Sequence, residues 1–483
     1  MTLLGACTVG PDYQRPEAEV PPAWHTDSFW RLAAPSHAPL SPDWWNGFGD
    51  PTLAALEGEA LAQNQTLVAA SAHYEQAKAT LANTSAQRVP EVDLSATASR
   101  FKISKNRPLT NYATPSESTV QNYLQLGPTI SYDTDLFGRI RREVEGAEAS
   151  AQQSADDLAN ARLVLTTELA TDYFTLRELD AEIDVLNQSV KLQQKALDYV
   201  NSEHQLGAVS GLEVLQQKSL LESTGVQAQL LVNQRQQFEH AIAALVGVPA
   251  PQFAIEPKVL DAKAPPIPLG LPSDVLQRRP DIASAERAMA AANAQIGVAK
   301  AAFFPSLTLT PGIGWESTQF ATLLSAPSLM WTLGATVSQV LFDGGRRAAN
   351  VKYASEGYRA TEANYRQTVL NAFQQVQDGI TGLSVLDGAA RQSQEAVGDA
   401  RRLLSLANDR YSGGLVAYLD VITAQQSLLN IERQDAQIRG QQMTLSVALV
   451  KALGGGWNAA DDLASGPNEV QPVATKEAMV PAP

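Results

Sequence analysis

The residues of this 483-residue chain that could carry out chemistry are few and scattered. No Ser/His/Asp, Cys/His or paired-carboxylate arrangement emerges, and no spacing typical of metal ligands is visible among the five histidines, at positions 25, 37, 73, 204 and 240. Asp343-Gly344-Gly345 could hold a phosphate, but a turn from strand to helix explains this sequence better. We therefore predict no enzymatic activity, no cofactor and no metal site.

The only cysteine, Cys7, lies at the extreme N-terminus and follows Leu4, Gly5 and Ala6. An aliphatic residue and two small residues before a cysteine are similar to the bacterial lipobox, in which the cysteine sulfur carries diacylglycerol. Acyl chains stabilise membrane attachment by roughly 0.8 kcal/mol per buried methylene. We predict that Cys7 is a lipid anchor and that residues 1–6 are a residual signal peptide. The alternative is a free cysteine in a disordered tail.

The charge balance limits the possible partners. The chain has 51 acidic and 36 basic side chains, a net charge of −15. Nucleic acid is therefore excluded as a partner, because its phosphates require clustered Lys and Arg. The sequence also lacks an uninterrupted apolar stretch of about 18 residues, the length that a membrane-spanning helix needs.

The second half of the chain repeats the first. Val89-Pro90 matches Phe304-Pro305 at an offset of 215, Leu136-Phe137 matches Leu341-Phe342 at 205, and Gly247 matches Gly454 at 207. In each copy we predict a helix, two strands, a long helix and a return helix. The first copy spans 53–248, with helices at about 53–88, 139–205 and 212–247 and strands at about 91–103 and 119–134. The second spans 273–454, with helices at about 273–302, 346–411 and 419–453 and strands at about 305–315 and 329–341.

The segments outside the repeats are rich in proline and contain five of the seven tryptophans. They are residues 7–52, 249–272 and 455–483. Because all of them flank predicted helices, we expect them to gather into one equatorial belt, with a disordered C-terminal tail beyond it.

The predicted strands alternate between apolar and polar residues. From Val120 to Tyr132 the even positions are mainly apolar, and the odd positions are mostly Gln, Ser, Thr and Gly. This period fits a transmembrane β-strand with one face towards lipid, although a half-buried sheet in a soluble domain has the same pattern. Aromatic residues near the strand ends, such as Trp315 and Trp331, favour the membrane. In the strand expected at about 91–103, the alternation of apolar and polar residues changes phase at Ser99–Arg100, which predicts a β-bulge there.

Four strands cannot close a barrel, and an open sheet edge is not tolerated in lipid. Membrane barrels begin at eight strands. The membrane interpretation therefore requires that two, three or four copies of the chain share one barrel.

The long helices are unusual for a globular domain. Residues 139–205 contain no proline and only one glycine, Gly146, so a continuous helix there would be about 100 Å long. Apolar residues recur at spacings of three, four and seven, which is typical of a coiled-coil seam.

Together these motifs resemble the outer-membrane efflux protein family, the TolC- and OprM-like outer-membrane factors, and most closely its NodT-type lipoprotein branch. The resemblance covers residues 7 to about 457 and rests on Val9–Pro16 (VGPDYQRP), Trp44–Asp50 (WWNGFGD), Asp135–Arg142 (DLFGRIRR), Leu341–Arg346 (LFDGGR) and Arg410–Leu415 (RYSGGL). It implies an α+β membrane protein: a homotrimer with a 12-stranded transmembrane β-barrel, four strands per chain, continued by a periplasmic α-helical coiled-coil barrel.

The resemblance also implies a function and partners. Such a protein is a passive outer-membrane conduit for small molecules, docked to a periplasmic adaptor (membrane fusion protein) and an inner-membrane pump. The alternative function is a periplasmic coiled-coil adaptor or structural scaffold, which would lack four alternating strands in two duplicated pairs.

Site residues fall at the turns between long and return helices. Gly207 and Gly414 are expected as helix C-caps, and the resemblance implies that these tips, with Leu415, contact the adaptor. It also implies a periplasmic gate at Arg410, Tyr411 and Asp420. In a trimer three Asp420 carboxylates would form a ring that attracts cations. Alternatively, Asp420 stabilises the positive N-terminal end of its helix.

Overall fold

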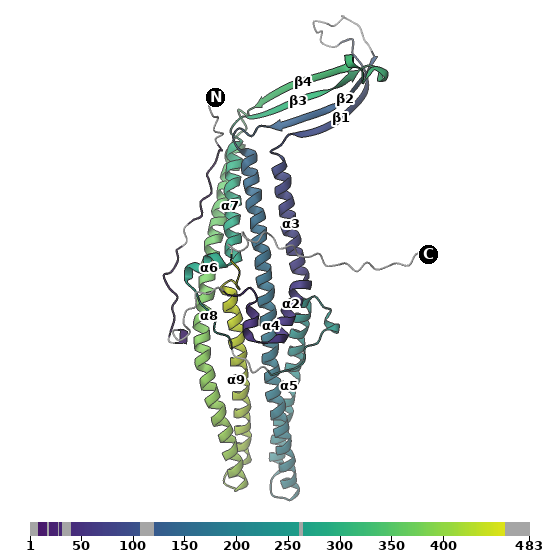
Figure 1. Cartoon of the computed structure of the whole chain (residues 1–483). Coiled ribbons are helices and arrows are strands. Elements are labelled where there is room, and N and C mark those ends of the chain that lie inside the picture. The colour runs from purple at the N-terminus through teal and green to yellow at the C-terminus, as the bar shows by residue number, and fades with distance from the viewer. Residues whose placement is uncertain are drawn as a thin grey trace, which may run out of the picture. The chain divides into compact units, whose positions relative to one another are not determined.

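The computed structural model describes residues 8–16, 19–27, 29–30, 40–106, 120–259 and 264–458 (Figure 1). Cys7 and the C-terminal residues 459–483 lie outside this range. The longer elements in chain order are α2 (Pro51–Gln63), α3 (Gln65–Ala86), β1 (Glu91–Lys102), β2 (Val120–Asp133), α4 (Arg139–Gln205), α5 (Gly211–Val246), α6 (Pro272–Arg278), α7 (Pro280–Ala301), β3 (Ser306–Ser317), β4 (Leu329–Ser338), α8 (Arg346–Ser412) and α9 (Tyr418–Ala452).

The described residues form two compact units, and each unit contains parts of both repeats. The first unit takes its residues from Met1–Glu17, Ala72–Ala155 and Ser284–Arg366. The second takes them from Ala18–Ser71, Asp156–Ala283 and Gln367–Pro483. Both long helices, α4 and α8, start in the first unit and end in the second.

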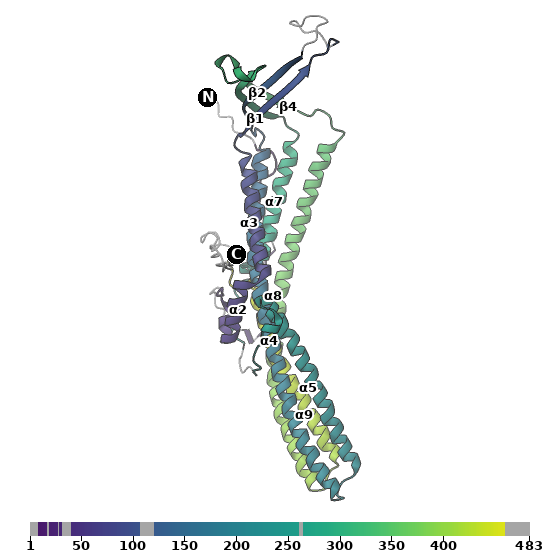
Figure 2. The ribbon, with the colours of Figure 1, turned by 90° about the vertical axis from the view of Figure 1, so that its right-hand side faces the viewer.

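The first unit contains one antiparallel sheet (Figure 2), in which the strands follow the order β1-β2-β3-β4 (Figure 1). Its β1–β2 ladder runs without interruption from Glu91 opposite Ser131 to Lys102 opposite Val120. The predicted bulge at Ser99–Arg100 is therefore wrong. The backbone pairing continues unchanged through this point. The alternation changes phase because a charged residue, Arg100, occupies a position on the apolar face.

That apolar face is exposed to an unusual degree. Leu94 is 77% exposed, Trp331 74% and Leu333 78%. Successive residues of a strand point to opposite faces of a sheet, and directly opposite residues of neighbouring strands point to the same face. By the strand register, Leu94, Trp331 and Leu333 therefore stand on one face. Exposed apolar surfaces of this kind mark contact with a membrane or with another protein. Within the part of the chain that the structure describes, no helix is both long and apolar enough to cross a bilayer.

The two expected helices at about 53–88 and 273–302 are each broken in two, so those two expectations are wrong. Asn64 separates α2 from α3 with an extended backbone, and Arg279 separates α6 from α7 in the same way. Arg279 precedes Pro280, and a residue before proline avoids the helical conformation. The two breaks are equivalent, since they are 215 residues apart.

Each break is bonded to the end of its return helix. The Asn64 side-chain amide donates to the carbonyl of Leu245 over 2.8 Å, and the Arg279 guanidinium donates to the carbonyl of Ala452 over 2.9 Å. Both donors satisfy carbonyls that a helix C-terminus leaves without a partner. The duplication has therefore preserved a helix junction as well as a helix order.

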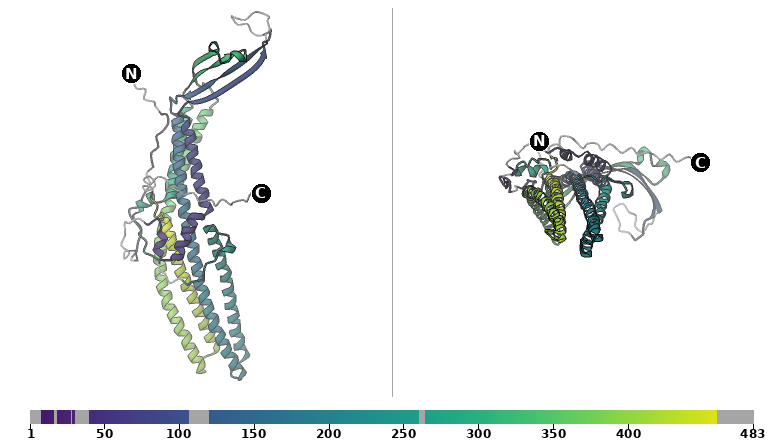
Figure 3. Two further views of the ribbon diagram at one scale, coloured as in Figure 1. Left: turned by 45° about the vertical axis from the view of Figure 1, so that its right-hand side comes forward. Right: turned by 90° about the horizontal axis from the view of Figure 1, so that it is seen from below.

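The second unit contains two helical hairpins, α4–α5 and α8–α9 (Figure 3). The linker between the repeats docks on the first hairpin through buried ionic groups. Asp180 on α4 accepts hydrogen bonds from Arg177 (2.9 Å), Arg235 (2.6 Å) and the backbone N–H of Lys258 (3.1 Å). Arg235 also donates to the carbonyl of Ile255 over 2.6 Å.

The N-terminal segment 8–16 belongs to the first unit, whereas residues 40–52 belong to the second. Arg142 on α4 donates to the Val9 carbonyl over 3.3 Å and to the Asp12 carboxylate over 2.7 Å. The Tyr13 hydroxyl donates to Glu286 on α7 over 2.5 Å. These bonds hold the residues that directly follow Cys7 against two helices.

A buried acid lies in α2. Glu57 is fully buried between Leu56 and Ala60 on the inner side of the helix, and neither carboxyl oxygen has a hydrogen-bond partner among the described residues. Burial raises the pKa of Glu57 to about 9, because a carboxylate is poorly solvated there.

The variant Glu57→Gln is expected to stabilise the protein increasingly as the pH rises. The unfolded chain releases the Glu57 proton near pH 4.3, whereas the folded chain retains it to about pH 9. Folding of the wild type is therefore penalised by about 1.4 kcal/mol per pH unit between these values, and glutamine removes the penalty. Urea unfolding at pH 5, 6.5 and 8 measures this trend. The same exchange at exposed Glu59, two residues along the helix, is the control; equal pH trends for both variants would contradict the assignment.

Candidate functional site

The turns that join the long helices to their return helices have the same backbone geometry. Gly207 has φ +75° and Gly414 has φ +70°. Ala208 N–H donates to the carbonyl of Glu203, and Leu415 N–H donates to the carbonyl of Arg410, each over 2.9 Å. A left-handed glycine with such a bond is a common helix ending. A Cβ at either glycine would have no atom within 4 Å, so another backbone can approach both turns closely.

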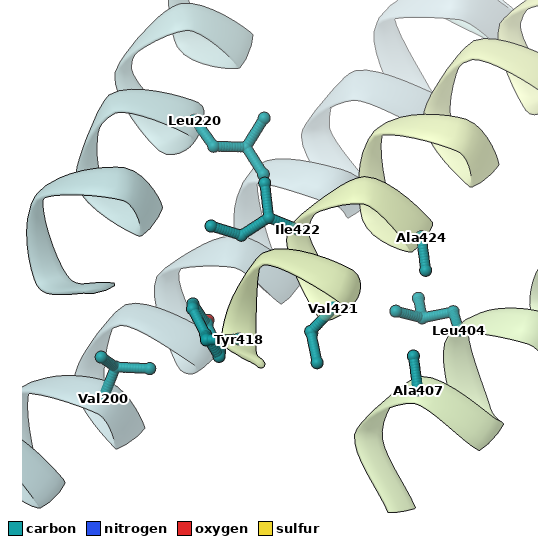
Figure 4. Packing of buried hydrophobic residues seen from close by; sticks show 8 residues of the cluster. All are labelled: Val200, Leu220, Leu404, Ala407, Tyr418, Val421, Ile422 and Ala424. Carbon is teal, nitrogen blue, oxygen red and sulfur yellow. The ribbon is translucent and has the colours of Figure 1, made fainter. Parts of the chain in front are cut away.

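Near these turns the two hairpins of one chain pack together. A buried apolar cluster unites both hairpins, and in Figure 4 Leu220 of α5 and Ile422 of α9 meet at its centre. Its buried members are Val200, Leu220, Leu404, Ala407, Tyr418, Val421, Ile422 and Ala424.

A buried hydrogen-bond chain ties the hairpins as well. The Tyr418 hydroxyl of α9 donates to Gln217 of α5 over 2.9 Å, and the Gln217 amide donates to the carbonyl of Gln193 in α4 over 3.0 Å. The sequence did not single out Gln217, because its role depends on how the hairpins pack.

Tyr411, a predicted gate residue, lies at this junction. Its ring centre is 5.0 Å from that of Tyr418, at an interplanar angle of 59°. Burial raises the pKa of the Tyr411 hydroxyl, and the neighbouring Glu213 carboxylate of α5 raises it further. Tyr411 is thus half-buried between the end of α8 and the first hairpin.

Arg410 and Asp420, the other predicted gate residues, are exposed, and no ion pair joins them within the chain. Asp420 is in the first turn of α9, where the helix has no hydrogen-bonding side-chain cap. Its equivalent in the first repeat, Glu213, does accept a bond from the backbone of Ser210 over 3.3 Å. The shorter Asp420 makes no such bond, so its carboxylate can act elsewhere while its charge still stabilises the helix end.

A groove of about 390 Å³ runs between the starts of α5 and α9. Leu212, Leu215 and Leu419, all more than half exposed, contribute to its lining. This groove could not be predicted from the sequence. A related signal is present in the sequence, since Leu212–Leu215 and Leu419–Ile422 occupy matching positions in the two repeats. That match by itself indicates only that the two segments are equivalent.

The described residues contain no group of three or more His, Cys, Asp or Glu side chains that could hold a metal ion. The chemistry available at the hairpin turns is therefore apolar contact, backbone approach and the field of exposed carboxylates.

Comparisons with known proteins agree with this architecture. The family model described as "Outer membrane efflux protein" matches residues 56–248 and 271–455. The probable efflux pump outer membrane protein SepC of Pseudomonas putida strain F1 is 30% identical over 474 residues, 97% of each chain. The solved outer-membrane channel OprN is 28% identical, with a TM-score of 0.87 over 93% of this chain and all of that one. The Campylobacter jejuni outer membrane channel CmeC is 27% identical, with a TM-score of 0.87 over 95% and 97%.

Proposed function

Since the chain belongs to the outer membrane efflux protein family, we propose that three copies of it form the outer-membrane channel of a tripartite efflux system. The observation that carries the proposal is the exposed apolar face of a sheet whose outer strands, β1 and β4, each have one neighbour among the described residues. In lipid, such edges must be paired. Three copies supply 12 strands, enough for a closed barrel with an aqueous lumen.

The hairpin turns are proposed as the docking site for a periplasmic adaptor that leads to an inner-membrane pump. Gly207 and Gly414 allow close backbone approach, and Leu415 is 72% exposed. The groove between α5 and α9 adds apolar surface beside both turns. Leucines that are more than half exposed next to open glycines suit the end of a partner's helical hairpin.

The gate is proposed at Arg410, Tyr411 and Asp420. The Tyr418–Gln217 bond and the apolar cluster around it hold the two hairpins of one chain together, so opening must separate them or move them jointly. Three unpaired Asp420 carboxylates around an axis would favour cations. Thr423, one turn further on, supplies no second acidic ring.

Cys7 is proposed to carry the lipid that attaches the protein to the outer membrane. Two sets of bonds support this: Arg142 of α4 binds the segment at Val9, and Tyr13 of the same segment binds α7. Together they fix the chain immediately after the anchor. The protein is proposed to have no catalytic role, and the partner pump supplies the energy.

Fractionation of cells that express the protein tests the proposal. We expect a heat-sensitive trimer that is extracted from the outer-membrane fraction by detergent. A monomer in the soluble periplasm would contradict it. The alternative adaptor or scaffold would also leave strands β1–β4 open to protease in intact outer membranes.

A further inference from the structure

The connection between β3 and β4, residues 317–328, combines exposed apolar side chains with a lack of charge. It lies at the end of the sheet remote from α7 and from the start of α8 (Figure 1). Phe320 is 83% exposed and Leu324 68%, and none of the residues 317–328 is ionisable. The chain between β1 and β2, which leaves the sheet at the same end, instead contains Lys105, Arg107 and Glu117. The two connections therefore suit different surroundings.

Four hydroxyl groups of the β3–β4 connection are bonded within it. That of Ser317 donates to the Gln319 carbonyl over 2.9 Å and shares a bond of 2.8 Å with the hydroxyl of Thr322. Those of Ser325 and Ser328 donate to the Thr322 carbonyl over 2.7 Å and 2.8 Å. Water would satisfy hydroxyl groups equally well, whereas beside lipid a polar group without a protein partner is costly. The network therefore suits a loop that lies at a lipid surface.

Two bonds fix the side of the sheet to which this connection is attached. Ser317, whose hydroxyl holds Thr322, is opposite Leu124 of β2, so its side chain stands on the apolar face. The Asn122 side chain, two residues from Leu124 and thus on the same face, donates to the Thr318 carbonyl over 3.4 Å. Both bonds therefore draw the connection towards the lipid-facing side of the barrel wall and away from the lumen.

The attachment lies at the level at which the apolar face of the sheet ends. On β1 that face ends beyond Ala98 with Arg100 and Lys102. Long cationic side chains at such positions reach the headgroup region of a membrane. Arg100 is directly opposite Asn122, so the bond from Asn122 to the connection is made at this level. In the proposed channel the connection is therefore held beside the headgroups.

We propose that residues 317–328 lie on the outer leaflet beside the barrel, with Phe320 and Leu324 inserted below its headgroups. This rests on the proposed outer-membrane channel. Lipid is the partner that the structure favours, because the connection continues the lipid-facing surface of the sheet: Leu329, the residue that follows it, is opposite Trp315 on that face. Amphipathic segments bind membranes in this way, with apolar side chains at the boundary between headgroups and acyl chains. Each copy in the channel then holds the outer leaflet beyond its strands.

A label that reports its surroundings tests the insertion in the full-length protein. Phe320→Cys is labelled with nitrobenzoxadiazole, whose emission shifts to the blue out of water, and is reconstituted into vesicles of phosphatidylethanolamine and phosphatidylglycerol. A second set of vesicles also contains phosphatidylcholine with a nitroxide on its acyl chain, which quenches fluorophores in contact with lipid. The unsubstituted protein, whose single cysteine is Cys7, gives the background.

Two further variants provide the scale. Leu333→Cys places the label on the lipid-facing side of β4, and Asn106→Cys places it in the charged connection after β1. Both residues are exposed, as Phe320 is, so that labelling leaves the packed interior unchanged. A heat-sensitive trimer on a gel shows that each variant is assembled.

We expect the nitroxide lipid to quench the label at position 320 nearly as strongly as that at position 333 and to leave the label at position 106 bright. Aqueous iodide is expected to quench the labels in the opposite order. A label at position 320 that iodide quenches and nitroxide lipid does not would overturn the insertion, since the connection would then face the lumen or the medium. Disulfide-linked multimers of unlabelled Phe320→Cys in high yield would overturn it in favour of contact between copies. A label at position 333 that lipid fails to quench would instead contradict the proposed channel.

Discussion

The variant Gly454→Ala is expected to destabilise the protein by roughly 3 kcal/mol or more. Gly454 follows α9 with φ +93°, where a side chain costs about 1–2 kcal/mol. A Cβ there would also lie 1.8 Å from the carbonyl oxygen of Arg278, at the break between α6 and α7. Because both atoms belong to backbones held by the Arg279–Ala452 bond, relief of the overlap requires the junction to separate.

Two other glycines make this a graded experiment. At Gly247, the equivalent position, the Cβ would lie 2.8 Å from the carbonyl oxygen of Gln63, so an intermediate loss is expected. At Gly414, with φ +70° and no atom within 4 Å, only the backbone cost of about 1–2 kcal/mol remains. Thermal unfolding in detergent, followed by circular dichroism, gives the order. Equal losses at Gly454 and Gly414 would show that the tight junction has no role in stability.

The variant Asp180→Ala is expected to cost about 3–5 kcal/mol. The Asp180 carboxylate is the common acceptor for Arg177 and Arg235, and all three side chains are buried. Its removal leaves the Arg177 guanidinium without its counter-ion in a site closed to water, whereas Arg235 retains only its pair with Glu239. The linker would lose the bond from the backbone N–H of Lys258 to Asp180, while Ile255 retains the bond from its N–H to Glu239.

A second aspartate provides the control for Asp180. Asp387 on α8 pairs with Arg391 over 2.5 Å, but Arg391 is 74% exposed. Both aspartates lie within long helices, so the change in helix propensity is the same. Loss of an exposed pair costs only about 0.2–1 kcal/mol. If the two variants unfold at the same urea concentration, the buried network is not what holds the linker.

Most of the secondary structure could be predicted from the sequence because its signals are local and repeated. The long helices α4 and α8 follow from stretches without proline, and their bounds differ from the expected 139–205 and 346–411 by at most one residue. The strands follow from alternation. The error at Ser99–Arg100 arose because a charged residue on an apolar face was taken for a change in the backbone.

The helix breaks needed more than local signals. Asn64 is tolerated inside a helix. Here its side chain accepts a bond from the N–H of Leu67 at the start of α3 and donates one to Leu245, 181 residues away, and the second bond became visible only in the fold. For Arg279 the signal was present, since Pro280 follows it. At the candidate gate, the duplication made Glu213 and Asp420 equivalent, but the bond between Tyr418 and Gln217 joins positions 201 residues apart and became visible only in the fold.

The central claim is that copies of this chain form a water-filled pore through a membrane. Planar-bilayer recording of the detergent-purified protein tests it most directly. In a KCl gradient we expect discrete conductance steps with a reversal potential on the cation-selective side, moved towards zero by Asp420→Asn and unchanged by Asp399→Asn, which removes the same charge from an exposed position on α8. A purified trimer that inserts into the bilayer without any conductance step would contradict the account.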